Sequence, residues 1–133
     1  MRRVVADASA FVEYLFRTPR AAAIGKVVEA DDVELHVPAL CDIELAAVVR
    51  RSLLATRVRE HRAAEAILDY LDLPLTRHGH TALIARVVQL RSNFSAYDAT
   101  YVALAEQLNA GLLTADDALG RAARSHTRVA VLR

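Results

Sequence analysis

Short apolar runs alternate with segments of helical periodicity along the chain, and this alternation limits the possible folds more than any other feature. The runs expected to form strands are residues 3–6, 33–37, 72–77, 112–115 and 128–132. Strands that alternate with helices form a parallel sheet with helices packed on both of its faces. The sequence therefore predicts a three-layer α/β/α fold around a parallel sheet of about five strands.

Helical segments fill the intervals between these runs, with apolar residues recurring three and four positions apart. They are residues 9–16, 20–30, 39–56, 57–71, 81–90 and 96–108, followed by a last helix that ends near residue 125. Ser95 is expected to cap the helix over 96–108, since its hydroxyl can accept from a free N–H of the first turn. Gly111 is expected to stop that helix, and Pro74 marks the third strand as an edge strand.

The expected strand order is 3-2-1-4-5, which places the first and fourth strands side by side. In open parallel sheets, ligands bind at the carboxyl ends of the strands where the order reverses. Asp7 follows the first strand and Asp116 follows the fourth, so their carboxylates are predicted to meet at this point. Asp98, Asp116 and Asp117 all have apolar neighbours in the sequence. Carboxylates buried in such surroundings must be paired, metal-bound or protonated.

Glu44 falls on an apolar stripe of the helix predicted for residues 39–56. Its neighbours three and four positions away are Leu40, Cys41, Ala47 and Val48. An exposed, solvated helix face does not explain a carboxylate in this position. Asp42 is about 200° round the helix from Glu44, so the two acids are not expected to serve one pocket.

Four acids are therefore candidates for one site, namely Asp7, Glu44, Asp98 and Asp116. Several carboxylates within a few ångströms cannot all ionise without a cation, and oxygen ligands favour Mg²⁺ or Mn²⁺ over zinc. Such ions can activate water and orient a phosphodiester. Helix capping is an alternative role for Asp7 and Asp116, and the helix dipole alone would favour Asp98 in a first turn.

The length of 133 residues suits one domain, residues 1–133, with one core. The single cysteine, Cys41, excludes internal disulfides and fits a reducing cytoplasm. Asp7 and Glu13 interrupt any signal-peptide core. No apolar run reaches transmembrane length, so no membrane association is expected.

Three segments and the closing strand carry a family resemblance. The segments are VVADASAFVEYL, PALCDIELAAVVRR and SAYDATYVALAEQLNAGLLTADDAL. Their order and spacing resemble the PIN-domain nucleases, most closely the VapC-type toxins of bacterial toxin–antitoxin pairs. The resemblance implies an endoribonuclease, dependent on Mg²⁺ or Mn²⁺, that hydrolyses RNA with a metal-activated water. It also implies a homodimer and a small antitoxin protein that blocks the pocket.

The same resemblance assigns roles to particular residues. The acids that correspond to the catalytic, metal-binding carboxylates of the family are Asp7, Glu44, Asp98 and Asp116. Ser9 and Thr114 match polar positions near the metal site of the family. Asp117 directly follows Asp116, which leaves the fourth assignment open between these two acids.

Two other classes of function remain as alternatives. A phosphotransfer or phosphatase-like domain would also have an acidic pocket on a parallel sheet. The phosphatases have an Asp-x-Asp pattern that is absent here, because Asp7 is followed by alanine and serine. Receiver domains also carry a lysine near the site, whereas the only lysine, Lys26, lies in the helix predicted for residues 20–30. A catalytically inert, partner-binding PIN domain is the second alternative, and the presence of all four acids argues against it.

Basic and histidine residues give weaker signals. An RNA path and a solvated helix face explain equally well the five arginines Arg50, Arg51, Arg57, Arg59 and Arg62. His78 and His80 lie two positions apart without an accompanying cysteine pair, so a zinc site is not supported.

Overall fold

Five parallel strands form the sheet of the protein, for which a computed structural model describes residues 1–132. The strands are β1 (Arg2–Ala6), β2 (Val33–Pro38), β3 (Leu75–His78), β4 (Gly111–Leu113) and β5 (Val131–Leu132). Their order is β3-β2-β1-β4-β5, which confirms the order predicted from the sequence. The switch point therefore lies between β1 and β4.

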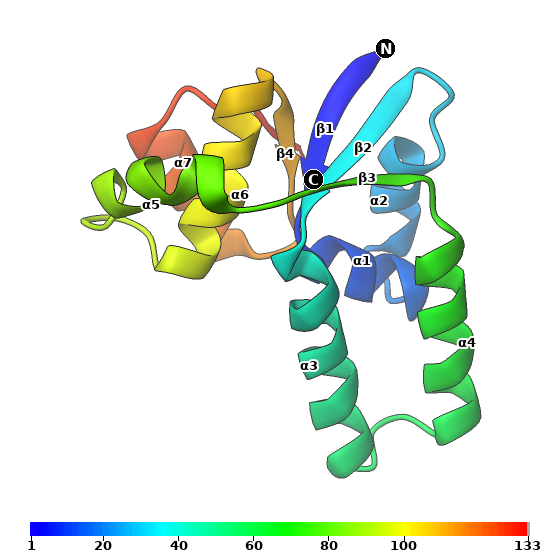
Figure 1. Ribbon diagram of the computed structural model, residues 1–133. Coiled ribbons are helices and arrows are strands. Elements are labelled where there is room, and N and C mark those ends of the chain that lie inside the picture. Colours follow the sequence, from blue (N-terminus) through cyan, green and yellow to red (C-terminus); the bar gives the residue numbers. More distant parts are fainter. Residues whose placement is uncertain (133) are drawn as a thin grey trace.

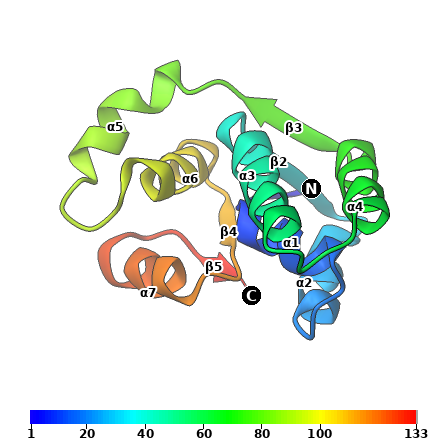
Figure 2. The ribbon, with the colours of Figure 1, turned by 90° about the horizontal axis from the view of Figure 1, so that it is seen from below.

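Helices cover both faces of this sheet and complete three layers (Figure 1, Figure 2). The helices that join β1, β2 and β3 are α1 (Ala8–Leu15), α2 (Ala21–Val28), α3 (Leu40–Leu54) and α4 (Glu60–Asp72). On the other side lie the 3-10 turn η1 (Thr81–Leu83), α5 (Ile84–Gln89), α6 (Ala96–Leu108) and α7 (Asp117–His126). The three-layer prediction is confirmed, because the connections change sides after β3.

The core is built around β1 and α6. Val4, Val5 and Ala6 of β1 are each at most 1% exposed. In α6 every residue from position 99 to position 105 is buried, and the helix packs against β1 and β2. A helix that is apolar nearly all round is stable only when other elements surround it. The central position of α6 places its first turn, which carries Asp98, beside the sheet.

Several element boundaries differ from those predicted. β3 begins at Leu75 rather than at residue 72, because α4 continues through Asp72. Within residues 1–132, β5 begins at Val131 rather than at residue 128 and comprises Val131 and Leu132. Their partners Leu112 and Leu113 end a strand of three residues. The segment predicted as one helix over 81–90 begins instead with a 3-10 turn.

The stop of α6 also differs from the prediction, because Asn109 rather than Gly111 ends the helix. Asn109 has the left-handed backbone angles φ 50° and ψ 47°, which asparagine tolerates better than most residues. Gly111 is instead the first residue of β4 and has no positive φ. A Cβ atom there would lie 3.3 Å from Cδ1 of Leu132, so close packing against β5 favours glycine.

The α3 and α4 helices run side by side and extend past the carboxyl ends of the strands (Figure 1). This arrangement places the amino-terminal half of α3, with Glu44, next to the switch point. Within residues 1–132, no helix combines the length and the apolar character needed to cross a bilayer.

Candidate active site

A cavity of about 230 Å³ opens beside the carboxyl ends of β1 and β4. Four segments that are distant in the sequence contribute its acidic lining, which consists of Asp7, Glu44, Asp98 and Asp116. The structure thus brings together all four acids singled out in the sequence. Asp117 does not line this cavity.

Asp7 caps α1 and lines the cavity at the same time, so the capping alternative and a role in the site are compatible. Its Oδ1 accepts from the backbone N–H of Ala10 at 3.1 Å and from Oγ of Ser9 at 2.6 Å. Its Oδ2 accepts from Oγ1 of Thr114 at 2.6 Å. The residue is 5% exposed, and this burial raises the pKa of its carboxyl although the hydrogen bonds oppose the shift. These contacts fix the carboxylate in one orientation.

The hydroxyl groups of Ser9 and Thr114 connect Asp7 to the turn between β4 and α7. Oγ of Ser9 accepts from the backbone N–H of Ala115 at 3.0 Å. Oγ1 of Thr114 accepts from the backbone N–H of Asp116 at 3.0 Å. Because each hydroxyl also donates to Asp7, the two acids at the switch point are held relative to one another by one hydrogen-bond network.

Glu44 is partly exposed and accepts a hydrogen bond at Oε1 from the hydroxyl of Tyr101. Tyr101 is 2% exposed, and burial, followed by the nearby Cys41 and Glu44, raises the pKa of its phenol far above the usual range. The phenol therefore stays protonated and acts as a donor. Tyr101 was not among the candidate residues, although its position three residues after Asp98 places both side chains on one face of α6.

The charges of the other three acids all act on the carboxyl of Asp98. Burial, together with the charges of Asp116, Asp7 and Glu44 in that order, raises the pKa of the Asp98 carboxyl to about 6. Burial and three like charges thus all disfavour the ionised form of this carboxyl. The four acids are therefore coupled electrostatically as well as being neighbours in one cavity.

The pKa of Asp98 predicts how the stability of the metal-free protein depends on pH. Because the folded pKa of about 6 exceeds the value of 3.8 for an unperturbed aspartate, the folded protein binds an additional proton between these pH values. The contribution of Asp98 to the free energy of unfolding is therefore complete below about pH 4 and is lost as the pH rises towards 6. Urea unfolding in a chelator should show a shallower fall in stability for Asp98→Asn than for the wild type. Asp31→Asn, at an exposed turn, is the control and should keep the wild-type slope.

A divalent cation fits the chemistry of this donor set. The four carboxylates offer only oxygen ligands, as Mg²⁺ and Mn²⁺ prefer, and their mutual repulsion would be relieved by a positive charge. As they stand, no three acidic, histidine or cysteine side chains among residues 1–132 are arranged to hold a metal ion. Three hydrogen bonds hold the carboxylate of Asp7, whereas the carboxylate of Glu44 accepts one, from Tyr101.

The turn after β4 separates the roles of Asp116 and Asp117. Asp116 lines the cavity and caps α7, since its Oδ1 accepts from the backbone N–H of Leu119 at 3.1 Å. Asp117 is the first residue of α7 and pairs with Arg20, whose Nη2 donates to Oδ1 at 3.1 Å. Both aspartates are exposed, so the burial inferred from their apolar neighbours was wrong for this turn. The neighbouring Leu119, not the acids, faces the core.

His78, the last residue of β3, and His80, which follows the strand, have structural contacts that their sequence spacing does not reveal. Nε2 of His80 accepts from the backbone N–H of Leu40 at 3.0 Å, at the amino end of α3. Ala39, which precedes this helix, provides no side-chain cap. His78 contacts the ring of His36, with 2.8 Å between Nε2 and Nδ1.

His80→Ala should lower the free energy of unfolding by about 1 kcal/mol, the usual cost of losing a helix cap. Urea unfolding at neutral pH measures this change. His61→Ala, an exposed position near the start of α4, is the matched control and should leave stability nearly unchanged. Equal stability of the wild type and His80→Ala would show that the bond does not act as a cap.

Of the five arginines considered for an RNA path, Arg51 lines the acidic cavity. It lies seven residues after Glu44 on α3, two turns along the same face. Arg62 is engaged elsewhere, because it donates to the carbonyl of Leu15 and lies 5.3 Å from the ring centre of Phe16.

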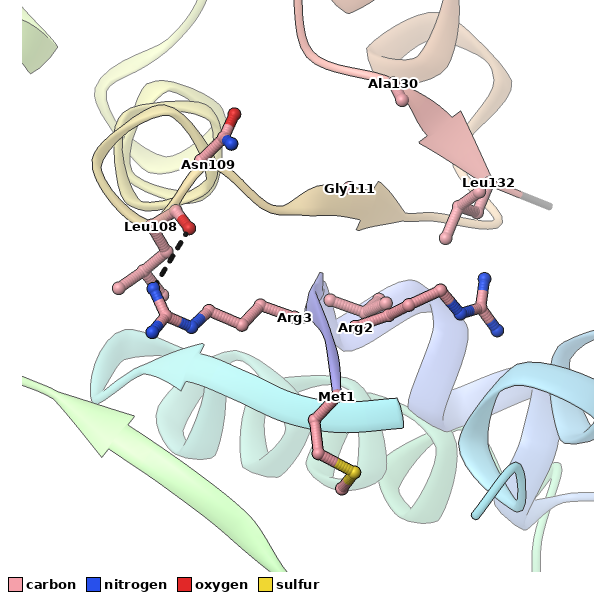
Figure 3. A pocket seen from close by; sticks show the side chains of 9 residues that line it. Met1, Arg2, Arg3, Leu108, Asn109, Gly111, Ala130 and Leu132 are labelled. Atoms are coloured by element: carbon pink, nitrogen blue, oxygen red, sulfur yellow. Dashed lines mark hydrogen bonds between the residues drawn. The ribbon is translucent and has the colours of Figure 1, made fainter. Parts of the chain in front are cut away.

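A larger cavity, of about 530 Å³, lies at the opposite end of β1 (Figure 3). Arg2 and Arg3 line it but point in different directions. Nε of Arg2 donates to Asp32 at 3.1 Å, and Nη1 of Arg3 donates to the carbonyl of Leu108 at 3.4 Å. The two guanidinium groups therefore do not converge on a common ligand.

Comparison with known proteins identifies the family. The family model described as PIN domain matches residues 4–125. Ribonuclease VapC12 of Mycobacterium tuberculosis is 36% identical over 123 residues, which are 92% of each chain.

Solved structures show the same fold at low sequence identity. The crystal structure of PAE2754 from Pyrobaculum aerophilum has a TM-score of 0.74 and 20% identity, over 98% of this chain and 83% of that chain. A structure of VapBC2 from Rickettsia felis, bound to a DNA fragment from their promoter, has a TM-score of 0.70 and 14% identity, over 97% and 96% of the two chains. On the evidence of the family match and the sequence relative, the chain belongs to the PIN-domain family, among the VapC-type ribonucleases.

Proposed function

We propose that the protein is an endoribonuclease that requires Mg²⁺ or Mn²⁺ and acts in the cytoplasm as the toxin of a toxin–antitoxin pair. The observation that carries this proposal is the meeting of four carboxylates from four distant segments in one cavity at the switch point of the sheet. The relatives of the chain are named as ribonucleases, which supports RNA as the substrate.

The proposed ligands of the cation are Asp7, Glu44, Asp98 and Asp116. A bound divalent ion supplies positive charge and Lewis-acid polarisation for the hydrolysis of a phosphodiester. Ser9 and Thr114 hold Asp7 in place, and Tyr101 orients Glu44 through its hydroxyl. Because three hydrogen bonds already fix Asp7, this ligand needs little reorganisation during the reaction.

Arg51 is the proposed contact for an RNA phosphate beside the cleavage site. It is exposed, lines the acidic cavity and shares a helix face with Glu44. A guanidinium can donate two hydrogen bonds to a phosphate group, and phosphate contacts position RNA without reading its sequence.

Arg51→Ala should weaken RNA binding and reduce the slope of log affinity against log salt by about one unit. Both quantities are measured by titrating labelled RNA with the protein at several salt concentrations. All variants carry Asp98→Asn in addition, so that the RNA is not cleaved. Arg50→Ala removes an arginine that is also exposed but does not line the cavity, so it should change the slope much less. Equal slopes for the two variants would assign Arg51 only to the general surface charge.

The proposed protein partners are a cognate antitoxin and a second copy of this chain. Leu68 and Leu71 of α4 are 62% and 60% exposed, and Ile84 and Val88 of α5 are 55% and 56% exposed. Two apolar faces on different helices suit two different protein contacts. Sedimentation velocity of the protein alone and of the protein co-purified with its antitoxin tests both contacts. A monomer in the sample without antitoxin would count against the homodimer.

The function itself is tested by incubating the protein with a panel of RNAs in separate reactions that contain Mg²⁺, Mn²⁺ or a chelator. The proposal predicts endonucleolytic products that require the metal and disappear in Asp98→Asn. Hydrolysis of a small phosphomonoester without RNA cleavage would favour the phosphatase-like alternative. Metal binding without any hydrolysis would favour an inert, partner-binding domain.

A further inference from the structure

One guanidinium holds the residues on both sides of Asp116. Nη1 of Arg20 donates to the backbone carbonyl of Ala115. Nη2 of the same residue donates to Oδ1 and Oδ2 of Asp117, at 3.1 and 3.2 Å. Arg20 immediately precedes α2 and is 95 positions from Ala115, so the contact joins two distant parts of the chain.

The planar guanidinium fixes the directions in which its N–H groups donate. A carbonyl and a carboxylate that bind the same guanidinium are therefore fixed relative to each other. The backbone N–H of Ala115 is held on the other side by Oγ of Ser9, at 3.0 Å. The turn that carries Asp116 thus has polar contacts both towards the cavity and away from it.

We propose that Arg20 is a positioning residue that keeps the carboxylate of Asp116 directed into the acidic cavity, and that its loss weakens metal binding. This inference rests on the proposed function, because it assumes that Asp116 is a metal ligand. The ion pair of Arg20 with Asp117 is about half exposed, with side-chain exposures of 47% for each residue. Exposed ion pairs contribute little to global stability, so the effect should appear in metal binding rather than in unfolding.

Isothermal titration of the metal-free protein with Mn²⁺ tests this role without measuring activity. Arg20→Ala should bind Mn²⁺ roughly ten- to a hundredfold more weakly than the wild type, as is usual when a residue supporting a metal ligand is removed. The melting temperature in a chelator should change little, and cleavage of RNA should recover at saturating Mn²⁺.

Arg86→Ala is the matched control, since Arg86 donates to both carboxylate oxygens of Glu106 at 2.9 Å and does not line the cavity. It should keep the wild-type affinity for Mn²⁺. Arg20→Lys keeps the charge but cannot donate in two fixed directions, so its affinity should fall between those of the wild type and Arg20→Ala. This variant also preserves the test if the alanine variant does not fold.

The double variant Arg20→Ala/Asp117→Ala should lose less Mn²⁺-binding free energy than the two single variants lose in total, because both residues act through their shared contact. Wild-type affinity in both Arg20 variants, with Mn²⁺ binding intact in the wild type, would overturn the positioning role and leave the proposed function standing. Absence of Mn²⁺ binding by the wild-type protein would overturn both.

Discussion

Asp98→Asn and Glu44→Gln are each expected to reduce RNA cleavage by at least roughly a thousandfold, a barrier increase of about 4 kcal/mol. Each change keeps the size of the side chain and removes one negative charge from the cavity. The loss of a carboxylate ligand weakens metal binding and the orientation of the substrate. Both variants should remain folded, because removing one charge from a repulsive cluster relieves repulsion in the metal-free protein.

Single-turnover cleavage at saturating Mn²⁺ measures the effect, and circular dichroism tests the fold. Asp42→Asn is the control for Glu44→Gln, since Asp42 lies on the same helix but binds Arg77 and Tyr70 outside the cavity. It should cleave RNA at nearly the wild-type rate. Normal cleavage by Glu44→Gln or Asp98→Asn would remove that residue from the site, and loss of folding would indicate a structural role.

Asp116→Ala should lower the cleavage rate by at least roughly a hundredfold, a barrier change of about 2.7 kcal/mol. Asp117→Ala should lose much less, because Asp117 lies outside the cavity lining and acts on the turn through Arg20. Its position in the first turn of α7 also favours the helix dipole by a few tenths to about 1 kcal/mol. Asp117→Ala should therefore lower stability slightly.

Single-turnover cleavage rates of the two alanine variants at saturating metal show which aspartate serves the site. Urea unfolding measures the change in stability of each variant. Comparable losses of rate would mean that both acids serve the site. A larger loss for Asp117→Ala would place the functional carboxylate one residue later than the geometry indicates.

The strand order was predictable because the alternation of strands and helices allows few topologies. The meeting of Asp7 with Asp116 followed from that order alone, since each acid follows one of the two strands at the switch point. Glu44 could be selected by its apolar neighbours because an α-helix fixes which residues share a face.

Other features depend on contacts between distant segments, which helical and strand periodicity do not encode. Tyr101 resembles an ordinary core residue in the sequence, and its hydroxyl on α6 reaches Glu44 on α3 only in the folded chain. His80 caps α3 across a separation of 40 positions. The exposure of Asp116 was mispredicted because sequence neighbours do not determine the direction of a side chain in a turn.

The most direct test of the account is a crystal of this protein grown with Mn²⁺ and measured near the absorption edge of manganese. We expect anomalous density in the cavity between Asp7 and Asp116, with the carboxylates of Glu44 and Asp98 directed towards it. The same crystal form of Asp98→Asn should show weaker density or none. An empty cavity at a Mn²⁺ concentration that supports full RNA cleavage would contradict the claim that these four carboxylates form the metal centre.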